Sequence, residues 1–249
     1  MTTRPFERIV MQPDTDTRAT TRKPLRDVRG FWRVLLAVVA PLPMLGMGIH
    51  YILSPVDGGE SFEATVAAYA AHEQTAGAIR WFALPFLVGL IPATFAVAWV
   101  ARRGAPRLTT AGALLALLGD LAGFPLIRGG DDLAYLTATR HFDVATTSRI
   151  QNALEDDPVQ LVAGLLFIVG IVVGLLLLGL ALWRSGAAPA WMGIVLAAGG
   201  FTHPFMPGHV ASGIGLVAAA VGFAGASVAL LRMRDDEFDL PPARPATRA

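Results

Sequence analysis

The sequence contains no cysteine, and this absence alone excludes several kinds of chemistry. Without thiols there is no disulfide bond, no thiolate metal site, no iron–sulfur cluster and no cysteine nucleophile. Charged residues are also scarce, because Asp, Glu, Lys and Arg make up only 16% of the chain and leave a net charge of +1. The basic residues are not gathered in one soluble region, so nucleic-acid binding is not expected.

Sequence motifs of the common enzyme classes are missing too. The chain has no P-loop, no GxGxxG sequence after a strand, no HExxH and no GxSxG. Such motifs place phosphate-binding amides, metal ligands or a nucleophile at fixed spacings, and without them an enzymatic activity has no support. An intramembrane enzyme built from dispersed residues would escape this test, so the balance is against an enzyme without excluding one.

Long apolar segments dominate what is present. A hydrocarbon core about 30 Å thick is crossed by a helix of roughly 20 apolar residues. Six such segments occur, at approximately 31–53, 79–100, 108–127, 159–183, 188–206 and 209–231, and the fifth is the shortest. The sequence therefore predicts an all-α polytopic membrane protein with a domain of six transmembrane helices at 31–231.

The basic residues predict how these helices are oriented. If the N-terminus is cytoplasmic, sixteen of the twenty Lys and Arg residues lie on the cytoplasmic side, and the outer side holds only Arg80, Arg128, Arg140 and Arg149. Cytoplasmic loops of membrane proteins are enriched in Lys and Arg. Both termini are therefore predicted to be cytoplasmic, and the protein is placed in a bacterial cytoplasmic membrane.

Polar segments precede and follow the predicted spans. Residues 1–30 are rich in Thr, Arg, Asp and Pro, and residues 232–249 join acidic residues to a Pro-rich end. Such segments bury too little apolar surface to offset the entropy of ordering. A flexible basic cytoplasmic tail is predicted at 1–30 and a second flexible cytoplasmic tail at 232–249.

The two long outer loops contain typical helix N-cap residues. Ser61 and Asp143 each precede apolar residues at helical spacing. Their side-chain oxygens can accept hydrogen bonds from the first free N–H groups of a helix. A short surface helix is predicted after each of them.

Small residues at four-residue spacing indicate where helices approach closely in lipid. The fourth span carries the pair Gly170 and Gly174. The sixth carries a longer stripe on one face, which includes Gly215, Ala219, Gly222 and Ala226. These residues are predicted to pack spans within one protein chain, and packing between two copies of the chain is the alternative.

Polar residues at membrane depth are the candidate functional residues. Asp120 is the only acidic residue inside a predicted span. An ionised carboxylate there would cost several kcal/mol, so it should face the bundle and either pair or hold a proton. All five histidines fall in the outer half. The helical rise places His203 at about the depth of Asp120, with His50 and His209 nearer the outer surface.

Three interpretations of these residues remain open. Asp120, His203, His50 and His209 could form a proton or solute site, they could hold a metal ion or haem, or they could be interfacial histidines beside a neutral aspartic acid. Histidine titrates near neutral pH and is a common metal ligand. The spacings match no metal signature, so neither a metal site nor a cofactor is predicted.

The layout resembles a family of six-span bacterial membrane proteins known only as a domain of unknown function. The matching segments are the first span, the Ala-rich stretch 65–72 leading into the second span through 76–78, the long loop after the third span, and the junction 182–191. The resemblance implies a similar six-helix fold over about 30–231. It implies no activity and no site residue.

Taken together, these features predict a non-enzymatic accessory, sensory or structural component of the membrane. Its predicted partners are the lipid bilayer and either another membrane protein or a second copy of the chain. One alternative is a small proton-coupled permease that uses Asp120 and His203. A second is a membrane redox subunit that binds haem or a metal through histidine.

Overall fold

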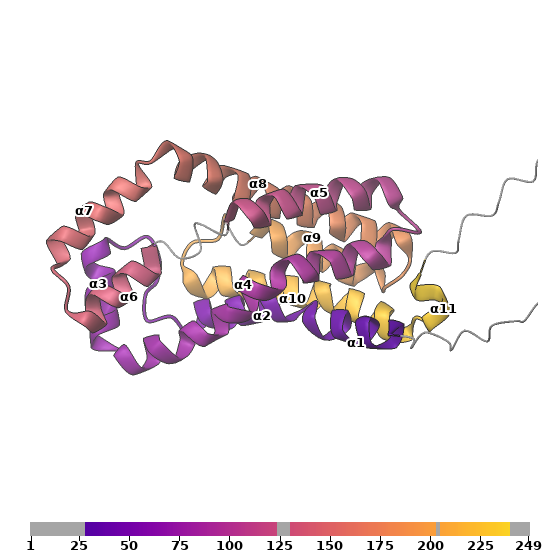
Figure 1. The fold of residues 1–249 in the computed structure, drawn as a ribbon, viewed down its shortest axis with the longest axis horizontal. Helices are drawn as coiled ribbons and strands as arrows, with labels where there is room; N and C mark the ends of the chain where they lie inside the picture. The colour runs from indigo at the N-terminus through magenta and orange to yellow at the C-terminus, as the bar shows by residue number, and fades with distance from the viewer. Residues whose placement is uncertain (1–27, 124–129, 203–204, 240–249) are drawn as a thin grey trace, which may run out of the picture.

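The computed structural model describes residues 28–123, 130–202 and 205–239. Within these ranges all regular structure is helical and no strand occurs, which confirms the predicted all-α class. Most of the helices run along one long axis of the molecule, as Figure 1 shows.

The described residues form eleven helices. In chain order they are α1 (Arg29–Val39), α2 (Leu42–Ile52), α3 (Phe62–Ala71), α4 (Glu73–Ala101), α5 (Pro106–Gly123), α6 (Gly130–Arg140), α7 (Val144–Glu155), α8 (Pro158–Ser185), α9 (Ala190–Thr202), α10 (His209–Arg232) and α11 (Asp235–Phe238).

Four segments are long and apolar enough to cross a membrane, as expected for a membrane protein. They are α1 with α2, then α4, α8 and α10. The remaining predicted spans correspond to α5 and α9, which have 18 and 13 residues. α5 is less apolar because it carries Arg107, two threonines and Asp120. Four of the six predicted spans are therefore supported by length and apolarity. The other two, α5 and α9, are shorter or less apolar.

The ends of the most apolar helix, α8, follow from local sequence. The Asp157 carboxylate accepts a hydrogen bond from the Val159 N–H at 2.7 Å, and Pro158 occupies the first helical position, where its missing N–H costs nothing. At the other end Gly186 adopts a left-handed conformation with φ 66°, which stops the helix.

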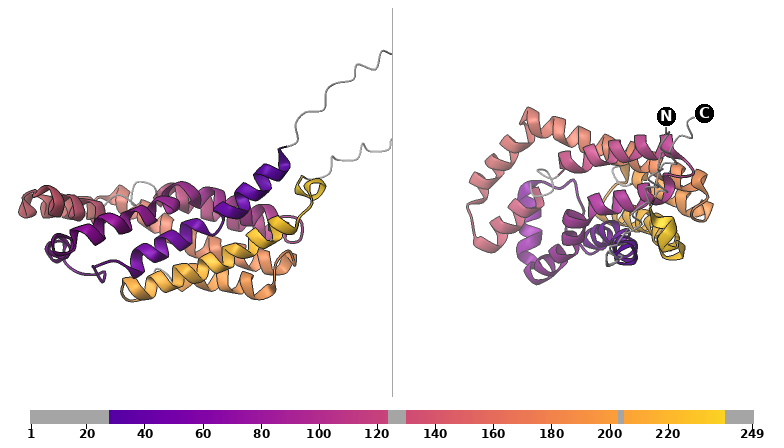
Figure 2. Two further views of the ribbon diagram at one scale, coloured as in Figure 1. Left: turned by 90° about the horizontal axis from the view of Figure 1, so that it is seen from below. Right: turned by 45° about the vertical axis from the view of Figure 1, so that its right-hand side comes forward.

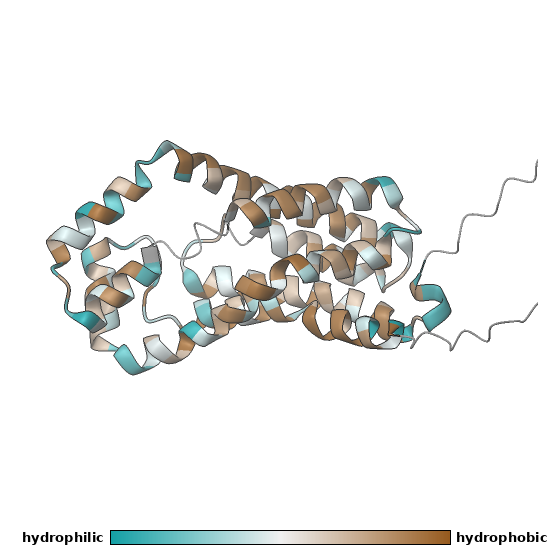
Figure 3. Cartoon of the chain, in the orientation of Figure 1, coloured by the Kyte–Doolittle hydropathy of each residue, from teal (hydrophilic) through white to brown (hydrophobic). Residues whose placement is uncertain are grey.

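The two ends of the helical bundle differ in character. At one end, here called the terminal end, the start of α1 lies beside α11, as both views in Figure 2 show. At the opposite end, the loop-helix end, α3, α6 and α7 form a cover between the longer helices (Figure 1). Figure 3 shows that apolar residues dominate the middle of the bundle, whereas hydrophilic residues are concentrated at its two ends.

The cover at the loop-helix end begins at the predicted N-caps. The Ser61 hydroxyl accepts a hydrogen bond from the Ala64 N–H at 3.2 Å at the start of α3. The Asp143 carboxylate accepts one from the Thr146 N–H at 2.8 Å at the start of α7. Hydrogen bonding to Thr146 lowers the pKa of Asp143 below its ordinary value, so this cap is charged at neutral pH.

Arginines tie α11 to the bundle at the terminal end. Arg33 on α1 pairs with Asp235 at 3.1 Å. The Phe238 carbonyl accepts hydrogen bonds from Trp99 Nε1 at 3.0 Å and from Arg102 Nη2 at 2.9 Å, and the Phe238 ring lies 5.3 Å from the Trp99 ring. Phe238 is buried as a result.

This arrangement differs from the flexible tail predicted at 232–249. The part of that tail up to residue 239 is described, and within it α11 is a short docked helix rather than a free segment. The acidic side chains gain arginine partners and Phe238 gains an apolar contact, which together offset the entropy of ordering. The predicted tail at 1–30 and the end of the second tail lie outside the described residues, except for residues 28–30.

Backbone contact between helices is closest where α5 crosses α8. A Cβ atom added to Gly170 would lie 2.5 Å from the Gly119 Cα, and one added to Gly174 would lie 2.6 Å from the Ala116 backbone nitrogen. The glycines predicted to pack spans therefore lie at a contact within this chain. Any larger side chain at Gly170 would force α5 away from α8.

The small residues of α10 lie against α9 in the same way. A Cβ atom on Gly222 would be 2.5 Å from Leu196, and one on Gly199 would be 2.5 Å from the Ala219 backbone nitrogen. Gly215 and Ala226, which belong to the same predicted stripe, are buried as well. The stripe therefore packs helices against one another within a single protein chain.

We expect Gly170→Leu to destabilise the protein by about 2 kcal/mol or more, because overpacked side chains typically cost 1–3 kcal/mol. The matched control is Val169→Leu, since Val169 is 43% exposed on the same helix. Thermal unfolding in detergent is the measurement. Equal melting temperatures for the two variants would contradict the close α5–α8 contact.

Candidate functional site

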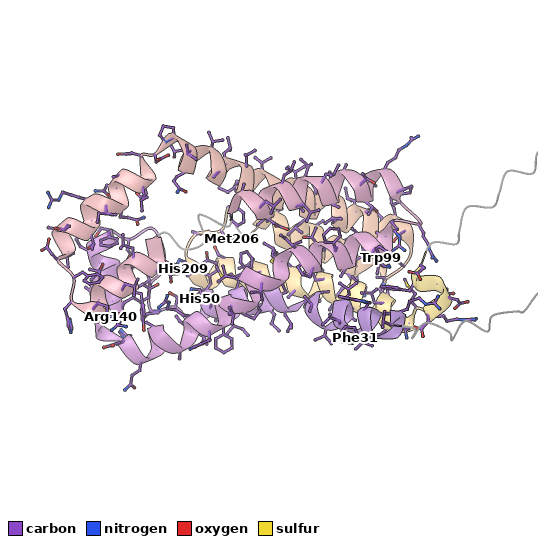
Figure 4. All side chains as sticks on the ribbon, viewed as in Figure 1. Phe31, His50, Trp99, Arg140, Met206 and His209 are labelled. Carbon is purple, nitrogen blue, oxygen red and sulfur yellow. The ribbon has the colours of Figure 1, made fainter. Side chains whose placement is uncertain are left out.

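A cavity of about 530 Å³ lies at the loop-helix end, between α2, α3, α4 and α6. Its polar lining, here called the polar wall, is formed by His50, Tyr69, Arg80, Asp131, Asp132 and Tyr135. Figure 4 shows His50 and His209 close together near this end, on neighbouring helices of the bundle. Charged and aromatic side chains from four helices thus converge on one space.

Arg80 is the centre of the polar wall. Its Nη2 atom lies 2.5 Å from Asp132 Oδ1, which links α4 to α6. Its Cζ atom lies 4.1 Å from the centroid of the Tyr135 ring, in a cation–π arrangement. The Tyr69 ring stands nearly perpendicular to the Tyr135 ring at 6.1 Å. Arg80 is therefore neutralised by a carboxylate and covered on one face by an aromatic ring.

His50 lines this cavity and is buried. Its Nδ1 atom lies 3.2 Å from the Ile79 carbonyl oxygen on α4. A carbonyl oxygen only accepts hydrogen bonds, so Nδ1 must carry the proton. In the neutral ring Nε2 then has a free lone pair and can accept a hydrogen bond from an occupant of the cavity.

Asp131 joins this cavity to a smaller one. The second cavity, of about 180 Å³, is lined by Asp131, Glu60, Glu155 and His209 among others. Among the described residues, none forms an ion pair with Asp131, and its side chain is exposed. The buried Nδ1 atom of His209 also has no hydrogen-bond partner in the described part of the chain. The two cavities thus share one carboxylate.

All three tyrosines of the chain lie at this end. Tyr69 and Tyr135 line the larger cavity, and the Tyr51 ring lies 4.7 Å from the His209 ring. Burial, and secondarily the charge of Asp131, raises the pKa of Tyr69 well above its ordinary value. The Tyr69 hydroxyl is therefore neutral at physiological pH.

The structure separates the residues that the sequence grouped as one candidate site. His50 and His209 come together, with the Tyr51 ring 5.7 Å from His50 and 4.7 Å from His209. Asp120 lies elsewhere, buried in α5, where its Oδ2 atom accepts a hydrogen bond from the Thr94 hydroxyl at 3.2 Å. His203 lies outside the described residues, so its pairing with Asp120 stays a prediction.

Sequence reasoning missed most of the polar wall. Arg80 appears there only as an exception to the positive-inside bias, and that exception is a signal that could have identified it. Asp132 lies 52 residues away from Arg80 in the chain, so no local spacing connects the two. The tyrosines belong to different helices and share no motif.

Neither the side chains that could bind a metal ion nor the comparisons with known proteins assign an activity. Within the described ranges, no group of three or more His, Cys, Asp or Glu side chains could hold a metal ion. No protein-family model, no curated protein and no solved structure matches the chain. The function must therefore be argued from the cavity itself.

We expect Arg80 and Asp132 to be coupled by about 0.5–1 kcal/mol in a double-mutant cycle of Arg80→Gln and Asp132→Asn. Both side chains are about one third exposed, so solvent weakens the pair. Thermal unfolding of the four proteins in detergent is the measurement, and Arg149→Gln with Asp132→Asn is the uncoupled control. A coupling near zero would contradict the ion pair.

Proposed function

We propose that this protein is a non-enzymatic sensory or accessory component of the bacterial cytoplasmic membrane that binds a small ligand at its outer end. The observation that carries this proposal is the 530 Å³ cavity, which is lined by both polar and apolar side chains from four helices. Small-molecule sites are typically concave, largely apolar and equipped with a few placed polar groups.

We further propose six spans with both termini in the cytoplasm. The spans are α1 with α2, then α4, α5, α8, α9 and α10. Two short connections lie at the terminal end: 102–105 joins α4 to α5, and 186–189 joins α8 to α9. The arginines in or next to them fit the positive-inside rule. The long helical connections lie at the opposite end. We therefore propose that the loop-helix end lies on the outer side.

A sensory role is supported by how the cavity is built. Its walls come from two bundle helices, α2 and α4, and from two helices of the cover, α3 and α6. An occupant would contact both parts at once and would favour the arrangement in which they are closed together. Binding outside could in this way be passed to a membrane partner or to a second copy of the chain, which remain the proposed partners.

The permease and redox alternatives stay predictions. The permease needs Asp120 to meet His203, and the described contact of Asp120 is with Thr94. The redox subunit needs histidine ligands, and the described contacts of His50 and His209 are with the Ile79 carbonyl and the Tyr51 ring. No contact among the described residues adds to either alternative, so the ligand-binding role is preferred.

The absence of cysteine allows the topology to be tested directly. We expect Ala145→Cys, in α7, to react with a membrane-impermeant maleimide in intact cells, because it is exposed at the outer end. Ala187→Cys, in the connection after α8, should react only after the cells are permeabilised. The unsubstituted chain is the unlabelled control. The reverse labelling pattern would show that the orientation is wrong.

Ligand binding is tested by thermal unfolding with a panel of chemically distinct compounds: a quinone, an anionic phospholipid, an alkylamine and a neutral alcohol. We expect at least one class to raise the melting temperature, since a ligand at 100 times its Kd stabilises the folded state by about 2.7 kcal/mol. Ala83→Phe, which fills the cavity wall, should abolish that rise. Ala78→Phe is the matched control, because Ala78 is exposed on the same helix.

If no class of compound stabilises the protein, or if Ala83→Phe responds as the wild type does, the cavity is not a ligand site and the proposed function fails. A response retained in Ala78→Phe and lost in Ala83→Phe supports it.

A further inference from the structure

The apolar lining of the larger cavity includes residues that are also exposed on the surface that would contact lipid. This lining comprises Met47 on α2 and Trp81, Leu84 and Leu87 on α4. Trp81 is 74% exposed and Leu84 is 45% exposed. Tryptophan is enriched at the membrane–water interface, which places this part of α4 at the headgroup level. The cavity is thus open to an apolar chain that arrives from the bilayer.

The polar wall of the cavity offers an occupant two acceptors that have no partner among the described residues. In the neutral imidazole of His50, Nε2 carries the lone pair and can accept a hydrogen bond, because Nδ1 is bonded to the Ile79 carbonyl. The Asp131 carboxylate has no ion-pair partner among the described residues. The positively charged donor of the wall, Arg80, has its Nη2 atom paired with Asp132 and one face of its guanidinium covered by Tyr135. A complementary head group would therefore donate hydrogen bonds.

The charges in the wall favour a cation. Asp131 and Asp132 face the single positive charge of Arg80, which leaves an excess of negative charge. The adjoining smaller cavity adds Glu60 and Glu155. Such a field attracts cations and repels a phosphate or carboxylate head group. A neutral quinone gains nothing from it and lacks the N–H donors that the free acceptors need.

The aromatic residues add a second source of affinity for a positive charge. Ring faces attract cations, and Tyr135 already holds the Arg80 guanidinium at 4.1 Å. Tyr69 and Trp81 line the same cavity. Both are uncharged and present further aromatic surface to a cationic head group.

From these contacts we infer that the ligand is an amphiphilic ammonium ion, which places its N–H groups toward His50 and Asp131 and its apolar chain along Met47, Leu84 and Leu87. This inference rests on the proposed function, because it names the ligand class of the same cavity. It specifies a charge, a donor pattern and a direction of entry.

The test uses four octyl compounds that share one chain and differ in the head group: octylammonium, octyltrimethylammonium, octanoate and octanol. Binding to the full-length protein in detergent is measured by isothermal titration calorimetry. We expect octylammonium to bind most tightly. It should bind roughly tenfold more tightly than octanol, because a charged hydrogen bond replaces a neutral one. Octyltrimethylammonium, which has no N–H donor, should be intermediate, and octanoate weakest.

Two variants at exposed carboxylates separate a specific site from general attraction to an acidic protein. Asp131→Asn should weaken octylammonium binding by roughly tenfold and change octanol binding much less, because the amide oxygen of Asn still accepts a hydrogen bond from a hydroxyl but no longer attracts a positive charge. Asp156→Asn is the matched control, since Asp156 is exposed and lines neither cavity. It should bind all four compounds as the wild type does.

The outcomes distinguish the inference from the function on which it rests. If octanoate or octanol binds as tightly as octylammonium, or if Asp131→Asn and Asp156→Asn behave alike, the ammonium inference is overturned. The proposed function survives that result if another class of compound stabilises the wild type but not Ala83→Phe. If Ala83→Phe removes the stabilisation by none of the compounds, both the inference and the proposed function fail.

Discussion

Close backbone contact between helices is the constraint on which the remainder of the structure depends. Helices in lipid gain little by hiding apolar side chains from one another, because the lipid chains are equally apolar. They associate where small residues let the backbones touch, as at Gly119 and Gly170, and where α2 meets α10. There a Cβ atom on Gly48 would lie 2.9 Å from the Gly213 carbonyl oxygen, and one on Gly213 would lie 2.8 Å from the Gly48 carbonyl oxygen. The distance between neighbouring helices is thus set by dispersion contacts at glycines, where no side chain separates the backbones.

The position of the candidate site follows from the same contacts. Gly46 brings α2 against the backbone of α4 at Phe82, and Gly48 brings it against α10. His50 follows two residues later, close enough to α4 to reach the Ile79 carbonyl. A helix held at two glycines has little freedom to rotate, so the imidazole is presented to the cavity in one orientation. The small residues therefore serve the site as well as the packing.

The two ends of the bundle are stabilised by different interactions. At the terminal end, Arg33 of α1 pairs with a carboxylate of α11, Arg102 directly after α4 binds its last carbonyl, and Phe238 fills an apolar position. At the loop-helix end, side chains cap and connect the cover helices. The Ser148 hydroxyl donates a hydrogen bond to Glu63 at 2.6 Å, joining α7 to α3, and this bond lowers the pKa of Glu63. One end is closed by a docked helix, and the other surrounds cavities.

The sequence by itself determined the features that depend on a few neighbouring residues or on composition. The helical class and the membrane-spanning length of four segments follow from runs of apolar residues, and the caps at Ser61 and Asp143 follow from local hydrogen bonding. Only the tertiary structure decided which distant residues meet. Arg80 pairs with Asp132 because the crossing of α4 and the placement of α6 bring them together across 52 residues, and the three tyrosines converge for the same reason. The apolar part of the α11 docking comes from a single residue, Phe238, in a charged tail, and its arginine partners are distant in the sequence, so no local signal distinguishes this segment from a free one. Local preference is encoded along the chain, whereas a site between helices depends on their crossing geometry, which no short stretch of sequence specifies.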